Sequence, residues 1–193
     1  MMKRILIFAS GSGTNTQKII EYFQSHSNAQ VVLVLTNKKD AKVIDRCKKL
    51  EIKSLYFSNN DFYHSNTVFN IIKSVQPDLI VLAGFLWKFP EYLLKEFPNR
   101  VINLHPALLP KYGGKGMYGM NVHRAVIKNK EKETGITIHY INENYDEGAI
   151  IFQKSFLVSE YDTPKTIASK IHELEYEFFP KVIEELLFSE NKE

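Results

Sequence analysis

Short apolar runs alternate with amphipathic stretches up to about residue 130. The apolar runs, at residues 5–8, 31–35, 79–83 and 101–104, are continuous. Continuous runs are typical of strands that are covered on both faces of a sheet. Helical spacing of apolar residues predicts helices between them, notably over residues 15–24 and 63–75. Alternating strands and helices predict an α/β fold, a mostly parallel Rossmann-like sheet flanked by helices.

The pattern changes after residue 130. Residues 134–142 alternate between polar and apolar side chains, and a second strand-like run covers residues 149–156. The polar turn between them predicts an antiparallel hairpin appended to the parallel sheet. Asp162-Thr163-Pro164 then predicts the start of a long C-terminal helix. Pro180 is expected to kink or divide that helix.

Composition narrows the class of protein. The chain has 193 residues, 44% of them hydrophobic, which is enough for a single domain over residues 1–193. It has 25 basic and 22 acidic residues and no dense basic run, so we expect no nucleic-acid partner. The single cysteine, Cys47, fits a reducing, cytoplasmic environment. The first apolar run is too short for a signal peptide or a membrane span, and we expect no membrane association.

A glycine-rich turn, Ser10-Gly11-Ser12-Gly13-Thr14-Asn15, follows the first predicted strand. Glycines allow close backbone approach, and the free amides at the start of a helix bind phosphate. Thr16 stands where a dinucleotide fingerprint has its third glycine, and no P-loop lysine follows. The turn therefore favours a phosphomonoester over a nicotinamide cofactor. The alternative is a plain strand-to-helix turn capped by Thr14 or Asn15.

The fourth run ends in Asn103-Leu104-His105-Pro106. Asn103 and His105 point to the same side if the strand continues that far, and Pro106 ends strand pairing. Ligands of parallel α/β sheets bind beyond the carboxyl ends of the strands. An amide there can stabilise a developing oxyanion, and a histidine can move protons near neutral pH. The alternative for His105 is a structural histidine with satisfied hydrogen bonds.

Residues 107–120 hold four of the nine glycines of the chain, at positions 113, 114, 116 and 119. A loop this long with little structure of its own is usually a functional lid or disordered. We expect a flap over a ligand, with a helix resuming near Asn121.

The acidic and histidine residues that follow leave alternatives open. Asp146 sits in ordinary turn chemistry, but near His105 it would raise the pKa of that imidazole. His139 alternates into the hairpin, where it either hydrogen-bonds within the sheet or lines the site. Glu173, Glu175 and Glu177 favour solvent, although any of them could bind a sugar hydroxyl. The six histidines form no HExxH pair and no cluster with cysteine, so we expect no metal site.

Taken together, these segments resemble the folate-dependent glycinamide ribonucleotide formyltransferases of purine biosynthesis. SGSGTN, NLHPALLPKYGG and ETGITIHYINENYDEGAII carry the resemblance, with AGFLWKFP at residues 83–90 and a final helix containing Glu175 and Pro180. It spans residues 3–187 and implies the formyltransferase fold. It further implies transfer of a formyl group from 10-formyltetrahydrofolate to the amine of glycinamide ribonucleotide (GAR). No metal is implied, and the protein would be a monomer or a homodimer.

The resemblance implies a role for three groups of residues. The catalytic group is Asn103, His105 and Asp146. The group that binds GAR is Gly11, Ser12, Gly13, Thr14, Asn15, His172, Glu173, Leu174 and Glu175. The group that binds folate is Leu86, Trp87, Lys88, Phe89, Asn103, Asn142, Glu143, Asn144, Tyr145 and Asp146.

The chain also departs from the family pattern. The stretch 111–123 is longer and richer in glycine than the compact Pro-Gly-x-His-x-His version. Trp87 stands where an arginine is common, and residues 58–66 lack the arginine that often helps to bind folate. None of these departures touches the catalytic group.

Three other functions compete with this one. Formyltetrahydrofolate hydrolase shares the catalytic group but normally carries an N-terminal regulatory domain. Methionyl-tRNA formyltransferase needs a C-terminal tRNA-binding domain, for which we expect no room. A catalytically silent nucleotide-binding module is disfavoured by the intact Asn103, His105 and Asp146.

Overall fold

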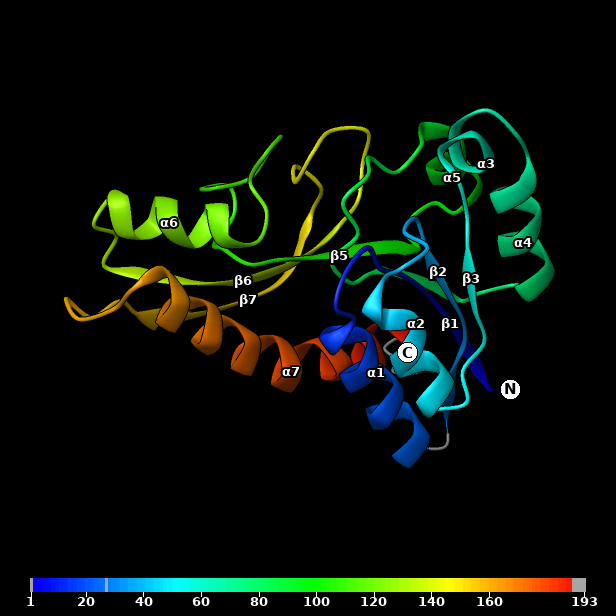
Figure 1. The fold of residues 1–193 in the computed structure, drawn as a ribbon, viewed down its shortest axis with the longest axis horizontal. Helices are drawn as coiled ribbons and strands as arrows, with labels where there is room; N and C mark the ends of the chain where they lie inside the picture. Colours follow the sequence, from blue (N-terminus) through cyan, green and yellow to red (C-terminus); the bar gives the residue numbers. More distant parts are fainter. Residues whose placement is uncertain (1, 27, 189–193) are drawn as a thin grey trace.

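The computed structural model describes residues 2–26 and 28–188. The strands in this part of the chain are β1 (Lys3–Phe8), β2 (Ala29–Thr36), β3 (Ser54–Tyr56), β4 (Leu79–Leu82), β5 (Val101–His105), β6 (Glu133–Tyr140) and β7 (Ile150–Leu157). They form one sheet in the order β3-β2-β1-β4-β5-β6-β7 (Figure 1). Pairing is parallel from β3 to β5 and antiparallel from β5 through β6 to β7. The predicted parallel sheet with an appended hairpin is confirmed.

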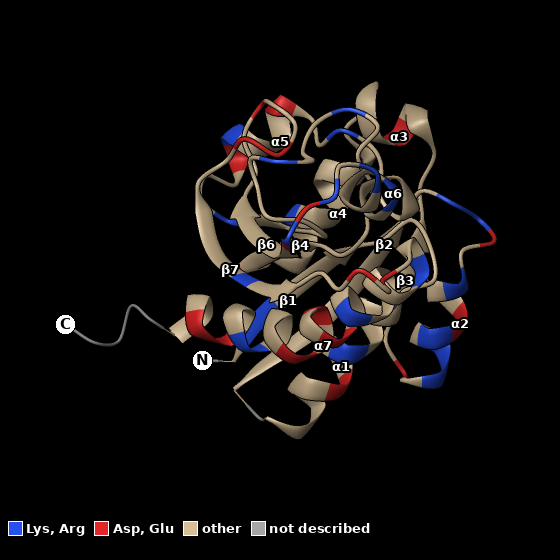
Figure 2. Cartoon of the chain, turned by 90° about the vertical axis from the view of Figure 1, so that its left-hand side faces the viewer, with Lys and Arg blue, Asp and Glu red and all other residues tan. Residues whose placement is uncertain are grey.

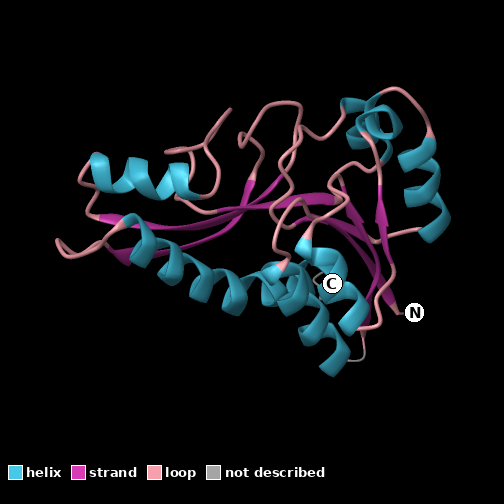
Figure 3. Ribbon diagram, viewed as in Figure 1, coloured by secondary structure: helices cyan, strands magenta, loops and turns pink. Residues whose placement is uncertain are grey.

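Helices lie on both sides of this sheet (Figure 3). They are α1 (Thr14–Ser25), α2 (Lys42–Lys49), α3 (Asn59–Tyr63), α4 (Thr67–Val75), α5 (Glu91–Glu96), α6 (Met120–Lys128) and α7 (Pro164–Phe188). Alternate side chains of β1 enter two cores. Ile5 and Ile7 pack with α1, α2 and α7, whereas Leu6 and Phe8 pack with α3, α4 and α5. Burial of both faces explains why the strands read as continuous apolar runs.

Two helix predictions differ in detail from the structure. The helix expected over residues 63–75 is α4, which begins later, at Thr67, and is preceded by a separate short helix, α3, which a capping box of Ser58 and Asp61 starts. Of the two alternatives for Pro180, division of the helix is wrong, because α7 continues through this residue. Phe179, Val182 and Ile183 are buried around this proline, so packing holds the helix together despite the lost backbone hydrogen bond. No helix in residues 2–26 and 28–188 is both long and apolar enough to cross a bilayer.

The sheet order reverses between β1 and β4. From β1 the chain builds outward through β2 to β3, and it then returns to add β4 and β5 on the other side. Crevices at such a switch point, beyond the carboxyl ends of the strands, are where open α/β sheets bind ligands. The glycine-rich turn after β1, the segment after β4 and the His105 end of β5 therefore meet at one edge.

Candidate active site

A cavity of about 550 Å³ opens at this edge of the sheet. It takes residues from all three of the predicted groups. Those that line it are Gly11, Ser12, Gly13, Thr14, Asn15, Leu86, Asn103, His105, Tyr145, Asp146, His172 and Glu175. A second cavity, of about 470 Å³, lies between residues 108–112 and 130–134 and contains none of them.

The other predicted residues do not line the larger cavity. They are Glu173, Leu174, Trp87, Lys88, Phe89, Asn142, Glu143 and Asn144. Glu173 is exposed, whereas Leu174 packs against the core. Phe89 is buried in an aromatic cluster, with its ring centroid 5.4 Å from that of Phe8, and Trp87 packs at the edge of the same cluster.

Strand β5 extends through His105, so Asn103 and His105 lie on the same face, as the two-residue period predicts. In the antiparallel ladder with β6, Asn103 lies opposite His139 and His105 opposite Thr137. The Nδ2 atom of Asn103 is 3.1 Å from Nε2 of His139.

His105 is held by the backbone of the glycine-rich loop, residues 107–120. Its Nε2 atom is 2.7 Å from the carbonyl oxygen of Tyr112. A carbonyl only accepts, so Nε2 carries the hydrogen and Nδ1 faces Oδ2 of Asp146 at 3.7 Å. Burial lowers the pKa of His105, and the opposing effects of Asp146 and the Tyr112 carbonyl are smaller. Asp146 thus acts in the expected direction, but burial wins and the neutral imidazole is favoured at pH 7.

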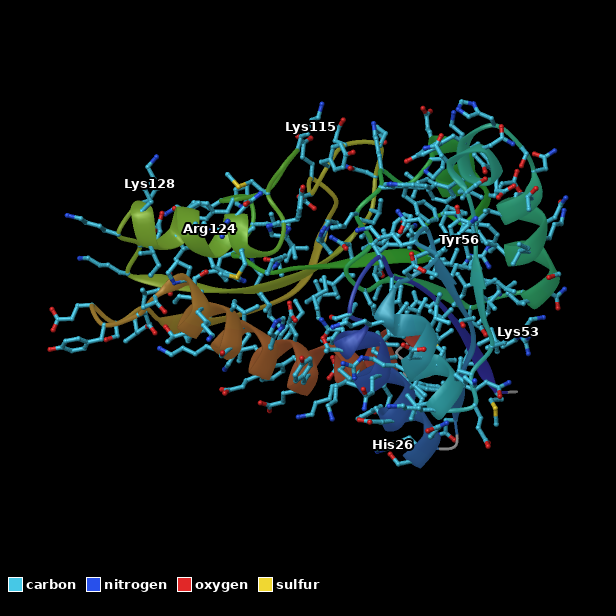
Figure 4. The ribbon with its side chains drawn as sticks, in the orientation of Figure 1. His26, Lys53, Tyr56, Lys115, Arg124 and Lys128 are labelled. Atoms are coloured by element: carbon cyan, nitrogen blue, oxygen red, sulfur yellow. The ribbon has the colours of Figure 1, made fainter. Side chains whose placement is uncertain are left out.

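Asp146 lies between two histidines. Its Oδ2 accepts a hydrogen bond of 2.9 Å from the backbone N–H of Gly114, and its Oδ1 is 3.7 Å from Nε2 of His139. The loop therefore supplies a backbone carbonyl to His105 and a backbone N–H to Asp146. Residues 114–119 of the loop also form part of the cavity wall. Figure 4 shows Lys115 at the tip of this loop, pointing away from the sheet.

The glycine-rich turn after β1 begins helix α1 at Gly13. Gly13 is the N-cap residue with φ 72°, and no side chain caps the helix, so the cap expected at Thr14 or Asn15 is wrong. Arg46 on α2 donates from Nε to the carbonyl oxygen of Ser12 at 2.7 Å. The N–H of Val43 donates to the Gly11 carbonyl at 3.2 Å. Figure 2 shows that Lys and Arg dominate α2, so a basic helix braces a turn whose amides suit a phosphate.

Glu175 joins the first and the last helix at the cavity. Its Oε2 accepts from Nδ2 of Asn15 at 2.8 Å and lies 2.9 Å from Nδ1 of His172. The hydrogen bond to Glu175 raises the pKa of His172. Glu175 is only 5% exposed, so of the three glutamates considered it is the one built into the site.

Sequence reasoning missed one buried histidine of the site, His123, and left the place of His139 open. His123 on α6 lines the cavity, and its Nδ1 is buried without a hydrogen-bond partner. His139 does not line the cavity, and of its two alternatives the hydrogen bond within the sheet is the one found, with Asn103 as partner. Its place opposite Asn103 depends on how the hairpin pairs with β5. Within the described chain, no three His, Cys, Asp or Glu side chains are grouped to hold a metal ion.

The stability of the protein is expected to fall as the pH falls below about 6.5. Burial lowers the pKa of His105, His123 and His139 from 6.5, so the unfolded chain binds more protons below that pH. The stabilisation is present above pH 6.5 and is lost as the pH approaches the folded pKa. Each histidine contributes up to about 1.4 kcal/mol per pH unit to the pH dependence of the free energy of unfolding.

Urea unfolding at pH 7.5, 6.5 and 5.5 measures this slope. His123→Leu should flatten it, because it removes one of the groups that titrates. His172→Asn is a control that should change the slope in the opposite direction, because the raised pKa of His172 stabilises the folded state at low pH. An unchanged slope in His123→Leu would contradict the assignment.

Comparisons with known proteins agree with this geometry. Residues 3–183 match the family described as formyl transferase. The chain is 33% identical to the phosphoribosylglycinamide formyltransferase of Bacillus subtilis, over 99% of this chain and 98% of that protein. It is 36% identical to the chloroplastic enzyme of the same name from Arabidopsis thaliana, of which it spans 64%.

Solved structures give the same result. The phosphoribosylglycinamide formyltransferase of Bacillus halodurans superposes with a TM-score of 0.86 at 35% identity, over 96% of each chain. Glycinamide ribonucleotide transformylase 1 of Geobacillus kaustophilus superposes with a TM-score of 0.88 at 32% identity, over 97% of this chain and all of that one. The chain belongs to the formyl transferase family and, within it, to the phosphoribosylglycinamide formyltransferases.

Proposed function

We propose that the cavity binds GAR and 10-formyltetrahydrofolate together and transfers the formyl group to the amine of GAR. The products are formyl-GAR and tetrahydrofolate, and the reaction takes place in the cytoplasm. One observation carries the proposal: the phosphate-type turn and the group Asn103, His105 and Asp146 line the same cavity. A phosphorylated substrate anchored at the turn could therefore present a reactive group at β5.

The lining suits two ligands of different character. On one side, the amides at Gly13–Asn15 would hold the phosphate, and the buried carboxylate of Glu175 would accept hydrogen bonds from the ribose hydroxyls. On the other side, Leu86, Tyr118 and Tyr145 are 45%, 54% and 42% exposed around the cavity. Such large apolar groups left in water fit the flat ring of a folate.

10-Formyltetrahydrofolate supplies the formyl carbon that the amine attacks. Asn103 would donate an N–H to the oxyanion that develops there, a contribution often worth about 3 kcal/mol per donor. His105 already donates its Nε2–H to Tyr112, so its free Nδ1 would accept the proton that the amine releases. The resulting imidazolium would be stabilised by Asp146, 3.7 Å away. As the oxyanion collapses, the bond from the formyl carbon to the folate nitrogen would break, and the imidazolium would give its proton to that nitrogen, which leaves as tetrahydrofolate.

Formyl transfer is tested by mixing the protein with 10-formyltetrahydrofolate, with and without GAR, and following deformylated folate by absorbance. Release that depends strictly on GAR, with formyl-GAR recovered, is the expected result. Release without GAR would favour the hydrolase, which uses the same three residues. No release in either mixture would contradict the proposal.

Glu175→Gln is expected to raise the KM for GAR about tenfold and to leave kcat nearly unchanged. The change keeps the shape of the side chain but removes a charged acceptor, and a hydrogen bond to a charged group is worth about 1.5 kcal/mol or more. Glu173→Gln is the matched control, because Glu173 is exposed and lies outside the cavity. Steady-state kinetics with GAR as the varied substrate measure both. Equal effects of Glu175→Gln and Glu173→Gln on the KM for GAR would contradict a role of Glu175 in binding GAR.

A further inference from the structure

His139 is a fully buried histidine that the proposed reaction does not use. It lies on β6 opposite Asn103, is 0% exposed and does not line the cavity. A histidine in such a place must have its nitrogens satisfied by neighbouring groups. Both ring nitrogens of His139 are next to hydrogen-bonding partners, so the chemistry of each partner determines which nitrogen carries a hydrogen.

The backbone determines which nitrogen carries the hydrogen. Nδ1 of His139 is 2.9 Å from the carbonyl oxygen of Tyr140, which only accepts, so Nδ1 is protonated. Burial lowers the pKa of His139 and keeps the ring neutral. Nε2 therefore offers a lone pair, and it is 3.1 Å from Nδ2 of Asn103.

This lone pair sets the orientation of the Asn103 carboxamide. The two ends of an amide are nearly equal in shape, so packing alone would allow it to turn over. With Oδ1 towards His139, two lone pairs would face each other. With Nδ2 towards His139, one N–H is bonded, and the second N–H and Oδ1 remain for the cavity.

We infer that His139 is a positioning residue that holds the amide of Asn103 in the orientation needed to donate to the oxyanion. The inference rests on the proposed function, in which Asn103 is that donor. Neutral His139 also has no hydrogen on Nε2 to offer to Oδ1 of Asp146, 3.7 Å away. Asp146 thus remains available to the His105 ring.

The first test reads the tautomers in the unaltered protein. Histidine labelled with ¹⁵N distinguishes protonated from bare ring nitrogens by chemical shift, and His139→Gln and His105→Gln assign the signals. We expect opposite tautomers at pH 7.5: hydrogen on Nδ1 of His139 and on Nε2 of His105. Hydrogen on Nε2 of His139 would overturn the inference.

The second test is a double-mutant cycle. His139→Phe should lower kcat about 100-fold with little change in either KM, because a misplaced donor costs rate rather than binding. His139→Gln should recover most of the rate, since its Oε1 can accept from Asn103. In an Asn103→Ala background, His139→Phe should cost almost nothing further.

The outcomes separate this inference from the proposed function. Additive effects of the two changes, or wild-type kcat in His139→Phe, would overturn the positioning role. Wild-type kcat in Asn103→Ala alone would instead refute the role of Asn103 in the proposed function, on which the inference depends. Thermal unfolding of every variant checks the fold. His26→Phe, at the exposed end of α1 labelled in Figure 4, is the matched control.

Discussion

Replacing His105 with alanine is expected to lower kcat about 1,000-fold, because the change removes the nitrogen that takes the proton of the attacking amine. The KM values for both substrates should change far less, since the group acts chiefly in the transition state. The imidazole is 3% exposed and its Nδ1 is its only nitrogen free of a hydrogen bond. Single-turnover kinetics with saturating substrates measure the loss directly.

A second variant separates chemistry from loop placement. His105 also holds the Tyr112 carbonyl, so alanine could release the glycine-rich loop. His105→Gln keeps a side-chain N–H that can reach this carbonyl but provides no base of suitable pKa. It should therefore be as slow as His105→Ala while binding both substrates normally. Turnover close to wild type in His105→Gln would refute proton transfer at this residue.

Gly13→Ala is expected to raise the KM for GAR about 10- to 100-fold, because a displaced turn loses a hydrogen bond to the charged phosphate, worth about 1.5 to 3 kcal/mol. Gly13 has φ 72°, a conformation that costs other residues about 1 to 3 kcal/mol. An added Cβ would also lie 2.6 Å from Cβ of Val43. The overlap pushes the turn away from α2 and the unfavourable φ distorts it, so the amides at the start of α1 would no longer point at one phosphate.

The neighbouring glycine provides the control. A Cβ on Gly11 would meet nothing within 4 Å, so Gly11→Ala tests the loss of a glycine without a clash. Gly13→Ala combined with Val43→Ala removes the contact with Cγ2 of Val43 but keeps those with its Cβ and Cα as well as the unfavourable φ, so it should restore only part of the affinity. Isothermal titration with GAR measures all three variants. Unchanged affinity in Gly13→Ala would exclude this turn as the phosphate site.

The predictable parts of the site are those fixed by neighbours in the sequence. Asn103 and His105 share a face because strand geometry has a period of two, and Gly13 marks a turn because it follows an apolar strand. The closeness of Asp146 and His139 depends on the register of the hairpin against β5, which no local pattern states. The pKa of His105 could not be predicted either, since burial outweighs the carboxylate.

Periodicity could have shown which of Glu173, Glu175 and Glu177 is buried. The buried stripe of α7 repeats every four residues through Ile167, Ile171, Phe179 and Ile183, and Glu175 is in step with it. Glu173 is out of step and exposed. A carboxylate within an apolar stripe signals a specific partner. By contrast, the burial of Phe89 reflects the aromatic cluster around Phe8, which joins segments distant in sequence.

The hydrogen bond between Asn15 and Glu175 joins residues 160 positions apart. On the ribosome, the turn that follows β1 emerges long before its partner on α7. A nascent chain halted before α7 would display the turn with no carboxylate beside it, and part of the core that α7 covers would be open to water. Long-range closure of this kind is slow and leaves apolar surface open to association. Ligand binding that needs both residues can therefore begin only after α7 has been synthesised.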